Sequence, residues 1–325
     1  MVLPLFLDSK SAIIDFMLLF ASGRTDIPAF YSKWFVNRVR AGFVDVRNPY
    51  YGEQVTRYKL DPSVVDCLVF CTKNPAPILP YIDELKKFGL YFFVTVTPYS
   101  KEIEPNVPEK SSVIDSVLEL SEKVGKNSVC WRYDPIFVDG ENYTVSNHIK
   151  YFRQMAARLN SATDRCIISF VDLYSKTKKN FPDLKEVSEN DQIFIAQSFS
   201  RIAGEYGMTI ESCAEKLDLS PFGVEKGCCV GKEQIEKATG IRLLKTGKQN
   251  LRQHCLCLPT RDIGYYNSCP HLCKYCYANY DAKIVEKNYS LHDDESPFLI
   301  GNSRPDDVIN FASQESWEDK QLLLF

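Results

Sequence analysis

Short apolar runs, each followed by a longer helical pattern, recur along the chain and restrict its possible folds more than any other feature. Six runs rich in β-branched or aromatic residues are typical of buried strands, and they cover residues 13–22, 66–72, 90–97, 128–133, 166–172 and 207–212. Between them, residues 148–159 and 192–207 place apolar side chains on one helical stripe. This alternation predicts an α/β fold built on a parallel sheet.

The sequence indicates less directly whether the parallel sheet is a closed barrel or an open sheet. Six βα units without a dinucleotide-type glycine loop favour a TIM-like (β/α) barrel, complete or partial, although periodicity alone does not exclude a doubly wound open sheet. In a barrel the functional residues gather where the strands end. Polar residues stand at several predicted strand ends, and together they indicate a site for a polar or zwitterionic ligand: Arg24, Asp26, Lys73, Arg132 and Asp134.

The chain divides into three parts by composition. Residues 1–212 are the predicted βα-repeat barrel body. Residues 213–276 hold eight of the 12 cysteines. We therefore expect residues 213–280 to be a cysteine-rich, metal-binding segment, and we expect this segment to complete the barrel. Residues 281–325 have ten Asp and Glu against four Lys and Arg, and we expect this acidic tail to pack on the barrel.

Charge and apolar pattern exclude some partners. With 39 Lys and Arg against 42 Asp and Glu, the net charge of -3 gives no field that draws the chain onto anionic lipid or nucleic acid, and a nucleic-acid substrate is not predicted. The N-terminal apolar runs are shorter than the roughly 20 residues of a membrane span. We therefore expect a cytoplasmic protein without membrane contact, in which clustered cysteines bind metal rather than form disulfides.

The cysteines Cys269, Cys273 and Cys276 have the spacing CxxxCxxC. Three thiolates so close in sequence can hold three irons of a [4Fe–4S] cluster and leave the fourth iron open to a small ligand. A zinc ion held by the same thiolates with His271 or His254 is the alternative.

The motif, with Tyr275 directly before its last cysteine, resembles the signature of radical S-adenosylmethionine (SAM) enzymes, and the run CPHLCKYCYAN resembles the form found around spore photoproduct lyase. The resemblance implies a [4Fe–4S] cluster whose open iron binds SAM, with Tyr275 near the adenine. It implies that an electron donor such as a flavodoxin or ferredoxin reduces the cluster. SAM is then cleaved to a 5′-deoxyadenosyl radical, which abstracts hydrogen from a substrate that the sequence does not identify.

The position of the motif differs from that superfamily. There it follows the first barrel strand, whereas here it follows a predicted strand at residues 261–267, near the C-terminus. A circular permutation reconciles the two, and it would bring residues 268–276 to the same mouth as Arg24 and Asp26. The fold expectation is therefore a partial, TIM-like barrel of circularly permuted radical SAM type with a C-terminal cysteine-rich iron–sulfur segment.

By position, the resemblance assigns binding of SAM to Arg24, Asp26, Arg132 and Tyr275. An arginine could pair with the carboxylate of SAM, and Asp26 could accept from its amino group. A salt bridge between Arg132 and Asp134 is an equally open interpretation.

The whole chain also resembles an uncharacterised bacterial family, the domain-of-unknown-function 1848 family. Matching runs include GRTDIPAFYSKWFVNR at 23–38, WRYDPI at 131–136 and CLCLPTRDIGYYNSCPHLCKYCYAN at 255–279. Because that family has no assigned reaction, the resemblance supports the fold and the metal more than the chemistry.

Four further cysteines could bind a second metal. Cys213, Cys229, Cys255 and Cys257 would together close a second [4Fe–4S] cluster, and the family pattern favours Cys229 over its neighbour Cys228. A structural zinc ion on the same four thiolates is the alternative. The remaining cysteines lie inside predicted strands, where a free thiol behaves as a small apolar group.

These observations favour an iron–sulfur protein that is a radical SAM enzyme with an unknown substrate. The alternative is a non-catalytic structural zinc or iron–sulfur protein that binds a ligand or nucleic acid. An electron-transfer protein with clusters but no SAM site is a third interpretation.

Overall fold

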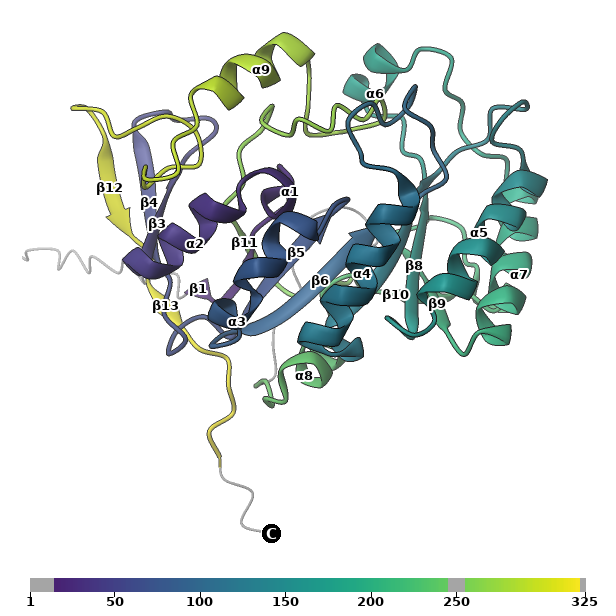
Figure 1. The fold of residues 1–325 in the computed structure, drawn as a ribbon, viewed down its shortest axis with the longest axis horizontal. Coiled ribbons are helices and arrows are strands. Elements are labelled where there is room, and N and C mark those ends of the chain that lie inside the picture. The colour runs from purple at the N-terminus through teal and green to yellow at the C-terminus, as the bar shows by residue number, and fades with distance from the viewer. Residues whose placement is uncertain (1–14, 245–254, 322–325) are drawn as a thin grey trace, which may run out of the picture.

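A computed structural model describes residues 15–244 and 255–321 of the chain. Its main sheet has eight strands in the order β10-β9-β8-β7-β6-β5-β2-β11, and every neighbouring pair runs parallel (Figure 1). The strands are β2 (Leu18–Phe20), β5 (Cys67–Thr72), β6 (Gly89–Thr95), β7 (Val129–Ile136), β8 (Arg165–Phe170), β9 (Thr209–Cys213), β10 (Glu225–Gly227) and β11 (Arg261–Asp262). The predicted α/β class and large parallel sheet are confirmed.

The strand order places a late segment beside the first strand of the sheet. From β2 to β10 the neighbours follow the order of the chain, so every crossover advances in the same direction. β11 lies at the other edge, where Arg261 pairs with Leu19 and Asp262 pairs with Phe20. Within the described residues the edge strands β10 and β11 do not pair with each other, so closure into a barrel is not shown.

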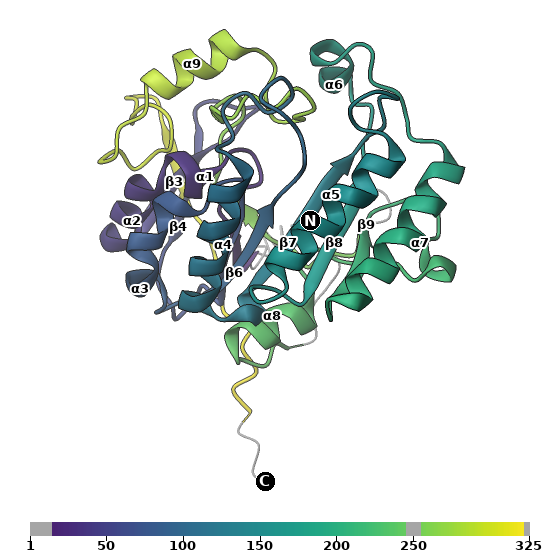
Figure 2. The ribbon, with the colours of Figure 1, turned by 45° about the vertical axis from the view of Figure 1, so that its right-hand side comes forward.

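Helices cover one face of the main sheet. Figures 1 and 2 show α2, α3, α4, α5 and α7 over this face. The α-helices are α1 (Ile27–Phe30), α2 (Ser32–Ala41), α3 (Ile82–Leu85), α4 (Lys110–Val124), α5 (Val145–Leu159), α6 (Ser175–Asn180), α7 (Glu189–Glu205), α8 (Lys232–Thr239) and α9 (Ala282–Ser290). Three short 3₁₀ helices span Ala76–Tyr81, Lys126–Ser128 and Ser220–Phe222.

The central strands β5, β6 and β8 are largely apolar because both faces of the sheet are buried there. Successive strand side chains point to opposite faces, so in β6 Phe92 and Val94 join the core under the helices, whereas Tyr91 and Phe93 join a second core on the other face. Under the helices, Phe152 of α5 stacks on Phe199 of α7 with ring centroids 3.8 Å apart.

The face opposite the helices is covered by the later part of the chain. Val230, Ile235, Leu243, Leu258 and Trp317 pack there against the strands. Each of these side chains is less than one-tenth exposed. Residues from the cysteine-rich segment and from the acidic tail therefore complete the second core.

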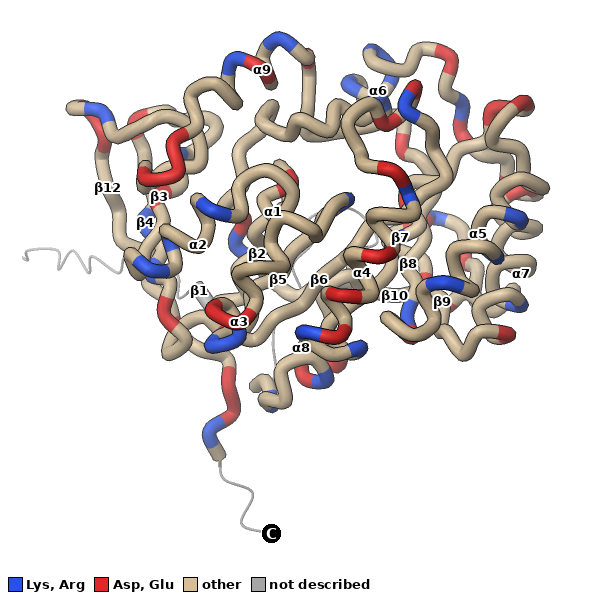
Figure 3. The backbone as a smooth tube through the Cα atoms, in the orientation of Figure 1, with Lys and Arg blue, Asp and Glu red and all other residues tan. Residues whose placement is uncertain are grey.

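Two small sheets attach the tail to the N-terminal part. β3 (Phe43–Arg47) and β4 (Gln54–Lys59) form an antiparallel pair, and β12 (Val308–Phe311) joins β4 in parallel. β13 (Gln314–Glu315) pairs in parallel with β1 (Asp15–Phe16). Figure 3 shows Lys and Arg interspersed with Asp and Glu along the helices. In the described ranges, no helix is both long and apolar enough to cross a membrane.

The predicted elements agree with the structure where the runs are fully apolar. The run at 66–72 is β5 and the helical pattern at 148–159 lies within α5. Residues 13 and 14 of the first predicted strand lie outside the described residues. The strand expected at 261–267 ends at Asp262, whose side chain accepts from the Gly264 amide in a turn.

Candidate metal centre at the carboxyl end of the sheet

Residues 268–280, the cysteine loop, follow β11 and lie against the loop that follows β6. The Lys274 amide donates to the Ile103 carbonyl at 3.0 Å. Leu272 has a φ of 56°, a left-handed conformation that costs a residue with a side chain roughly 1–2 kcal/mol. The surrounding contacts therefore hold the loop in a conformation that it would not adopt alone.

The loop brings its three thiols into one electrostatic environment. Burial raises the pKa of Cys269, and Asp26, Cys276 and Cys273 raise it further. Burial also raises the pKa of Cys273, and the ammonium of Lys73 offsets part of that rise. A thiol of raised pKa is protonated at neutral pH, so binding of a metal here would release protons.

The three thiols of the loop are the number of ligands that a cluster with one open iron would need. In residues 15–244 and 255–321, no three His, Cys, Asp or Glu side chains meet at the spacing of one metal ion. The ring nitrogens of His271 face Asp26 and the Asn106 carbonyl. His254, the other histidine considered for zinc, lies outside the described residues.

Asp26 ties the cysteine loop to the start of α1 and to the end of β5. Its Oδ1 accepts from the Ala29 amide at 3.0 Å and so caps α1. Its Oδ2 accepts from the Lys73 amide at 2.8 Å and lies 2.9 Å from His271 Nε2. Both oxygens of this carboxylate, which is 5% exposed, are therefore used within the chain.

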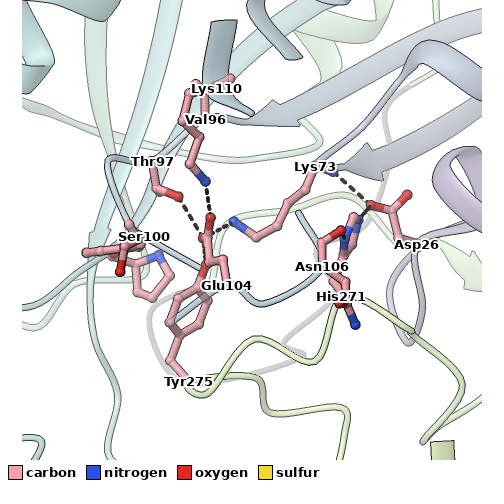
Figure 4. Close-up of polar contacts among 12 residues, drawn as sticks. Asp26, Lys73, Val96, Thr97, Ser100, Glu104, Asn106, Lys110, His271 and Tyr275 are labelled. Atoms are coloured by element: carbon pink, nitrogen blue, oxygen red, sulfur yellow. Dashed lines mark hydrogen bonds and ion pairs between the residues drawn. The ribbon is translucent and has the colours of Figure 1, made fainter. Parts of the chain in front are cut away.

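Glu104 is the centre of the polar network in Figure 4, and its side chain is fully buried. It accepts from Lys73 Nζ at 2.7 Å and from Thr97 Oγ1 at 2.8 Å, and Lys110 Nζ and the Tyr275 hydroxyl also donate to it. Burial raises the pKa of Glu104, but Lys73 and Lys110 outweigh that effect and lower it to about 2. Glu104 is therefore a carboxylate at neutral pH.

Two ammonium groups face this one carboxylate, which leaves an excess of positive charge beside the cysteine loop. Lys73 is the nearer cation to the thiols, since it acts on the pKa of both Cys273 and Cys276. Cationic side chains stabilise thiolates and the negative charge of a thiolate-bound cluster. A cavity of about 190 Å³ lined by Tyr99, Glu104 and Lys110 adjoins the network.

Tyr275 connects the cysteine motif to this network. Its hydroxyl donates to Glu104, its ring centroid lies 5.7 Å from that of Tyr99, and Lys73 Nζ lies 5.5 Å from its centroid. Contacts to both the ring and the hydroxyl of Tyr275 thus hold this aromatic residue of the motif in place.

The two arginines proposed from the sequence have different partners. Arg24 Nη2 donates to the Asp262 carbonyl at 2.9 Å, and its Nε lies 3.6 Å from Asp262 Oδ1. Arg132 forms the salt bridge with Asp134 that the sequence left open, and its Nη1 lies 3.7 Å from Cys71 Sγ. Arg132 Nε is buried without a hydrogen-bond partner among the described residues.

The second set of cysteines lies on the sheet face opposite the helices. Cys213 ends β9, and Cys213, Cys255 and Cys257 belong to the second core, with Cys229 packed against it. Cys213 Sγ and Cys229 Sγ are 3.1 Å apart.

Sequence reasoning missed Glu104 and Lys110. Glu104 lies in the loop after β6 and Lys110 begins α4. This stretch carries several charged residues without period, and nothing in the sequence distinguishes the one acid that becomes buried. Lys73, at a strand end, and Tyr275, in the cysteine motif, were singled out from the sequence and belong to this network.

The fold and the cysteine loop define an α/β protein with a thiol-rich loop at the carboxyl end of a parallel sheet. The chain belongs to the family described as Domain of unknown function (DUF1848), whose profile matches residues 18–278. No curated protein matches the chain.

Among solved structures, one similar chain is a candidate alpha-L-fucosidase from Bacteroides thetaiotaomicron. It shares 12% identity with a TM-score of 0.28, and the match covers 51% of this chain and 50% of that chain. The chain thus spans about half the length of this neighbour. A likeness this weak carries no argument about fold or activity.

Proposed function

We propose that this protein is a radical SAM enzyme in which Cys269, Cys273 and Cys276 hold a [4Fe–4S] cluster. The observation that carries the proposal is the parallel pairing of β11 with β2, because it brings a C-terminal CxxxCxxC loop to the carboxyl end of the sheet. We propose in addition that the sheet is a partial barrel of the circularly permuted radical SAM type.

With SAM bound, a reduced cluster of this kind supplies one-electron cleavage to methionine and a 5′-deoxyadenosyl radical. The residues of the chain would prepare that chemistry. Asp26 holds the loop through His271, and Glu104 holds Tyr275. Lys73 places a positive charge beside Cys273, which favours an anionic cluster.

Three side chains are the proposed contacts to SAM: Arg132, Tyr275 and Arg24. Arg132 has the strongest case, because its buried Nε lacks a hydrogen-bond partner in the described part of the chain and a guanidinium can pair with a carboxylate. Tyr275 would lie near the adenine. Arg24 would help to hold the methionine end, whereas Asp26 would act by positioning the loop, because its oxygens already accept from the chain.

The proposal includes an external one-electron donor such as a flavodoxin or ferredoxin, a cytoplasmic location and an unidentified substrate. It assigns no nucleic acid and no membrane as a partner.

Anaerobic reconstitution with iron and sulfide tests the proposal. The protein is reduced with dithionite in the presence of SAM, and 5′-deoxyadenosine is measured by chromatography. We expect product from the wild type and from Cys166→Ala, which removes a buried strand thiol on the helix side of the sheet. We expect none from Cys273→Ala.

Two results would contradict the proposal. One is cluster-loaded, reduced wild type that forms no 5′-deoxyadenosine, which would favour a structural or electron-transfer protein. The other is zinc in place of iron in protein purified without oxygen, which would favour a structural zinc protein.

A further inference from the structure

We infer that Cys213, Cys229, Cys255 and Cys257 form a second iron–sulfur centre on the sheet face opposite the helices. This centre is separate from the cysteine loop and does not depend on the function proposed above.

The sulfur atoms converge without forming a disulfide. Cys213 Sγ and Cys229 Sγ are 3.1 Å apart, too far for an S–S bond of about 2.05 Å. Cys229 also contacts the side chain of Cys257. Thiols from three separate segments thus meet in one place.

Backbone pairing fixes the three segments that carry these thiols. Gly227 of β10 lies opposite Cys213 in the parallel register, which brings residue 229 close to the end of β9. The Leu258 amide donates to the Val230 carbonyl at 2.8 Å, which sets Cys257 beside Cys229. Directly after Cys213, Ala214 has a φ of 56°, so the chain turns sharply there.

The surroundings suit a metal centre. Cys213, Cys255 and Cys257 are 6%, 9% and 7% exposed, and apolar side chains of the second core surround them. The guanidinium of Arg132 lies near Cys213 and Cys229. Both thiols raise the pKa of Arg132, whereas its burial lowers that pKa. A buried cation compensates the charge of thiolates.

Packing alone explains the strand cysteines but not this group. Cys67 and Cys130 occupy apolar positions of β5 and β7, as isolated small groups do. Cys229, Cys255 and Cys257 instead come from segments outside the named strands and helices. Cys229 contacts the last residue of β9, and Cys255 and Cys257 lie in the same second core. Four thiolates are the full ligand set of a cubane cluster.

The sequence spacing favours iron–sulfur over zinc. Structural zinc sites usually take pairs of cysteines separated by two to four residues, whereas a single residue separates Cys255 from Cys257.

Metal counting in a variant without the first centre tests the inference. Cys269→Ala/Cys273→Ala/Cys276→Ala is reconstituted anaerobically, and iron and sulfide are measured per chain. We expect about four of each and a broad visible absorption. Adding Cys229→Ser should abolish both, whereas adding Cys228→Ser, the matched control one residue away, should leave both unchanged.

Cys229→Ser in the otherwise unchanged chain gives an independent count if the triple variant fails to fold. It should hold about four irons and four sulfides per chain fewer than the wild type, and an unchanged count would overturn the inference. Stoichiometric zinc in place of iron, or a Cys213–Cys229 disulfide in mass spectra of alkylated peptides, would also overturn it. Failure to cleave SAM would leave this count unaffected, so the two proposals fail separately.

Discussion

The polar contacts around Glu104 show how one residue organises the carboxyl end of the sheet. Its carboxylate is buried between Lys73 and Lys110 and also binds Tyr275 of the cysteine motif. Removing one member of a buried charge group leaves its partners without compensation, which costs far more than the loss of a surface pair. We therefore expect the motif to depend on a residue that is distant from it in sequence.

Glu104→Gln should lower the free energy of unfolding by roughly 3 kcal/mol at neutral pH, because two ammonium groups lose their counter-charge. The folded-state pKa of Glu104 is lowered from 4.5 to about 2. Its stabilisation is therefore complete above pH 4.5 and is lost as the pH falls toward about 2. Urea unfolding should show that the difference in free energy of unfolding between wild type and variant becomes smaller as the pH is lowered through this range.

Glu109→Gln is the matched control, since Glu109 lies in the same loop with an exposed side chain. It should stay within about 0.5 kcal/mol of the wild type. A gap for Glu104→Gln that does not change with pH would show that the carboxylate charge is not what stabilises the network.

At the scale of elements, α1 and the cysteine loop share one carboxylate. Asp26→Ala removes the cap of α1 and the acceptors for the Lys73 amide and His271. A lost cap costs about 1 kcal/mol and an unsatisfied buried group about 1–3 kcal/mol. We expect a loss of roughly 3 kcal/mol in chemical unfolding, and a smaller loss for Asp26→Asn.

Asp139→Ala serves as the comparison for that variant. Asp139 also accepts from two backbone amides, but in an exposed turn. Its loss should be below about 1 kcal/mol. Equal losses for the two alanine variants would mean that Asp26 is an ordinary turn residue and does not hold the loop.

Elements buried on both faces could be predicted from the sequence, whereas half-exposed ones could not. CLVFCT and LYFFVTVT are continuous apolar runs and correspond to β5 and β6. β3 and β4 alternate with polar residues, and β12 is exposed along its length, so neither type of strand stands out from loops. Asp26 was found because it follows a predicted strand. Arg132, expected at a strand end, lies inside β7, and the burial of Glu104 arises only when the loop after β6 folds.

At the scale of the whole molecule, the tail is part of the second core. Trp317 is 3% exposed on the face opposite the helices, and its amide donates to Asp66 Oδ2 at 2.8 Å. Only part of that tail lies on the helix-free face.

Trp317→Ala should lower the free energy of unfolding by roughly 3–5 kcal/mol, as for other buried aromatic residues truncated to alanine. Phe311→Ala, in the same tail, removes a ring that is 76% exposed, and its effect should stay within about 0.5 kcal/mol. Thermal and urea unfolding measure both. A small effect of Trp317→Ala would show that the tail is dispensable for the second core.

The pairing of β11 with β2 has a consequence for how the protein is made. Leu19 and its partner Arg261 are separated by about 240 residues. A ribosome adds about 5–20 residues per second, so it needs on the order of 10–50 seconds to synthesise this stretch. During that time the edge of β2 that later pairs with β11 has unpaired backbone N–H and C=O groups, with which strands of other nascent chains can pair. The cysteine loop is completed later still, since Cys269, Cys273 and Cys276 follow Arg261 in the order of translation.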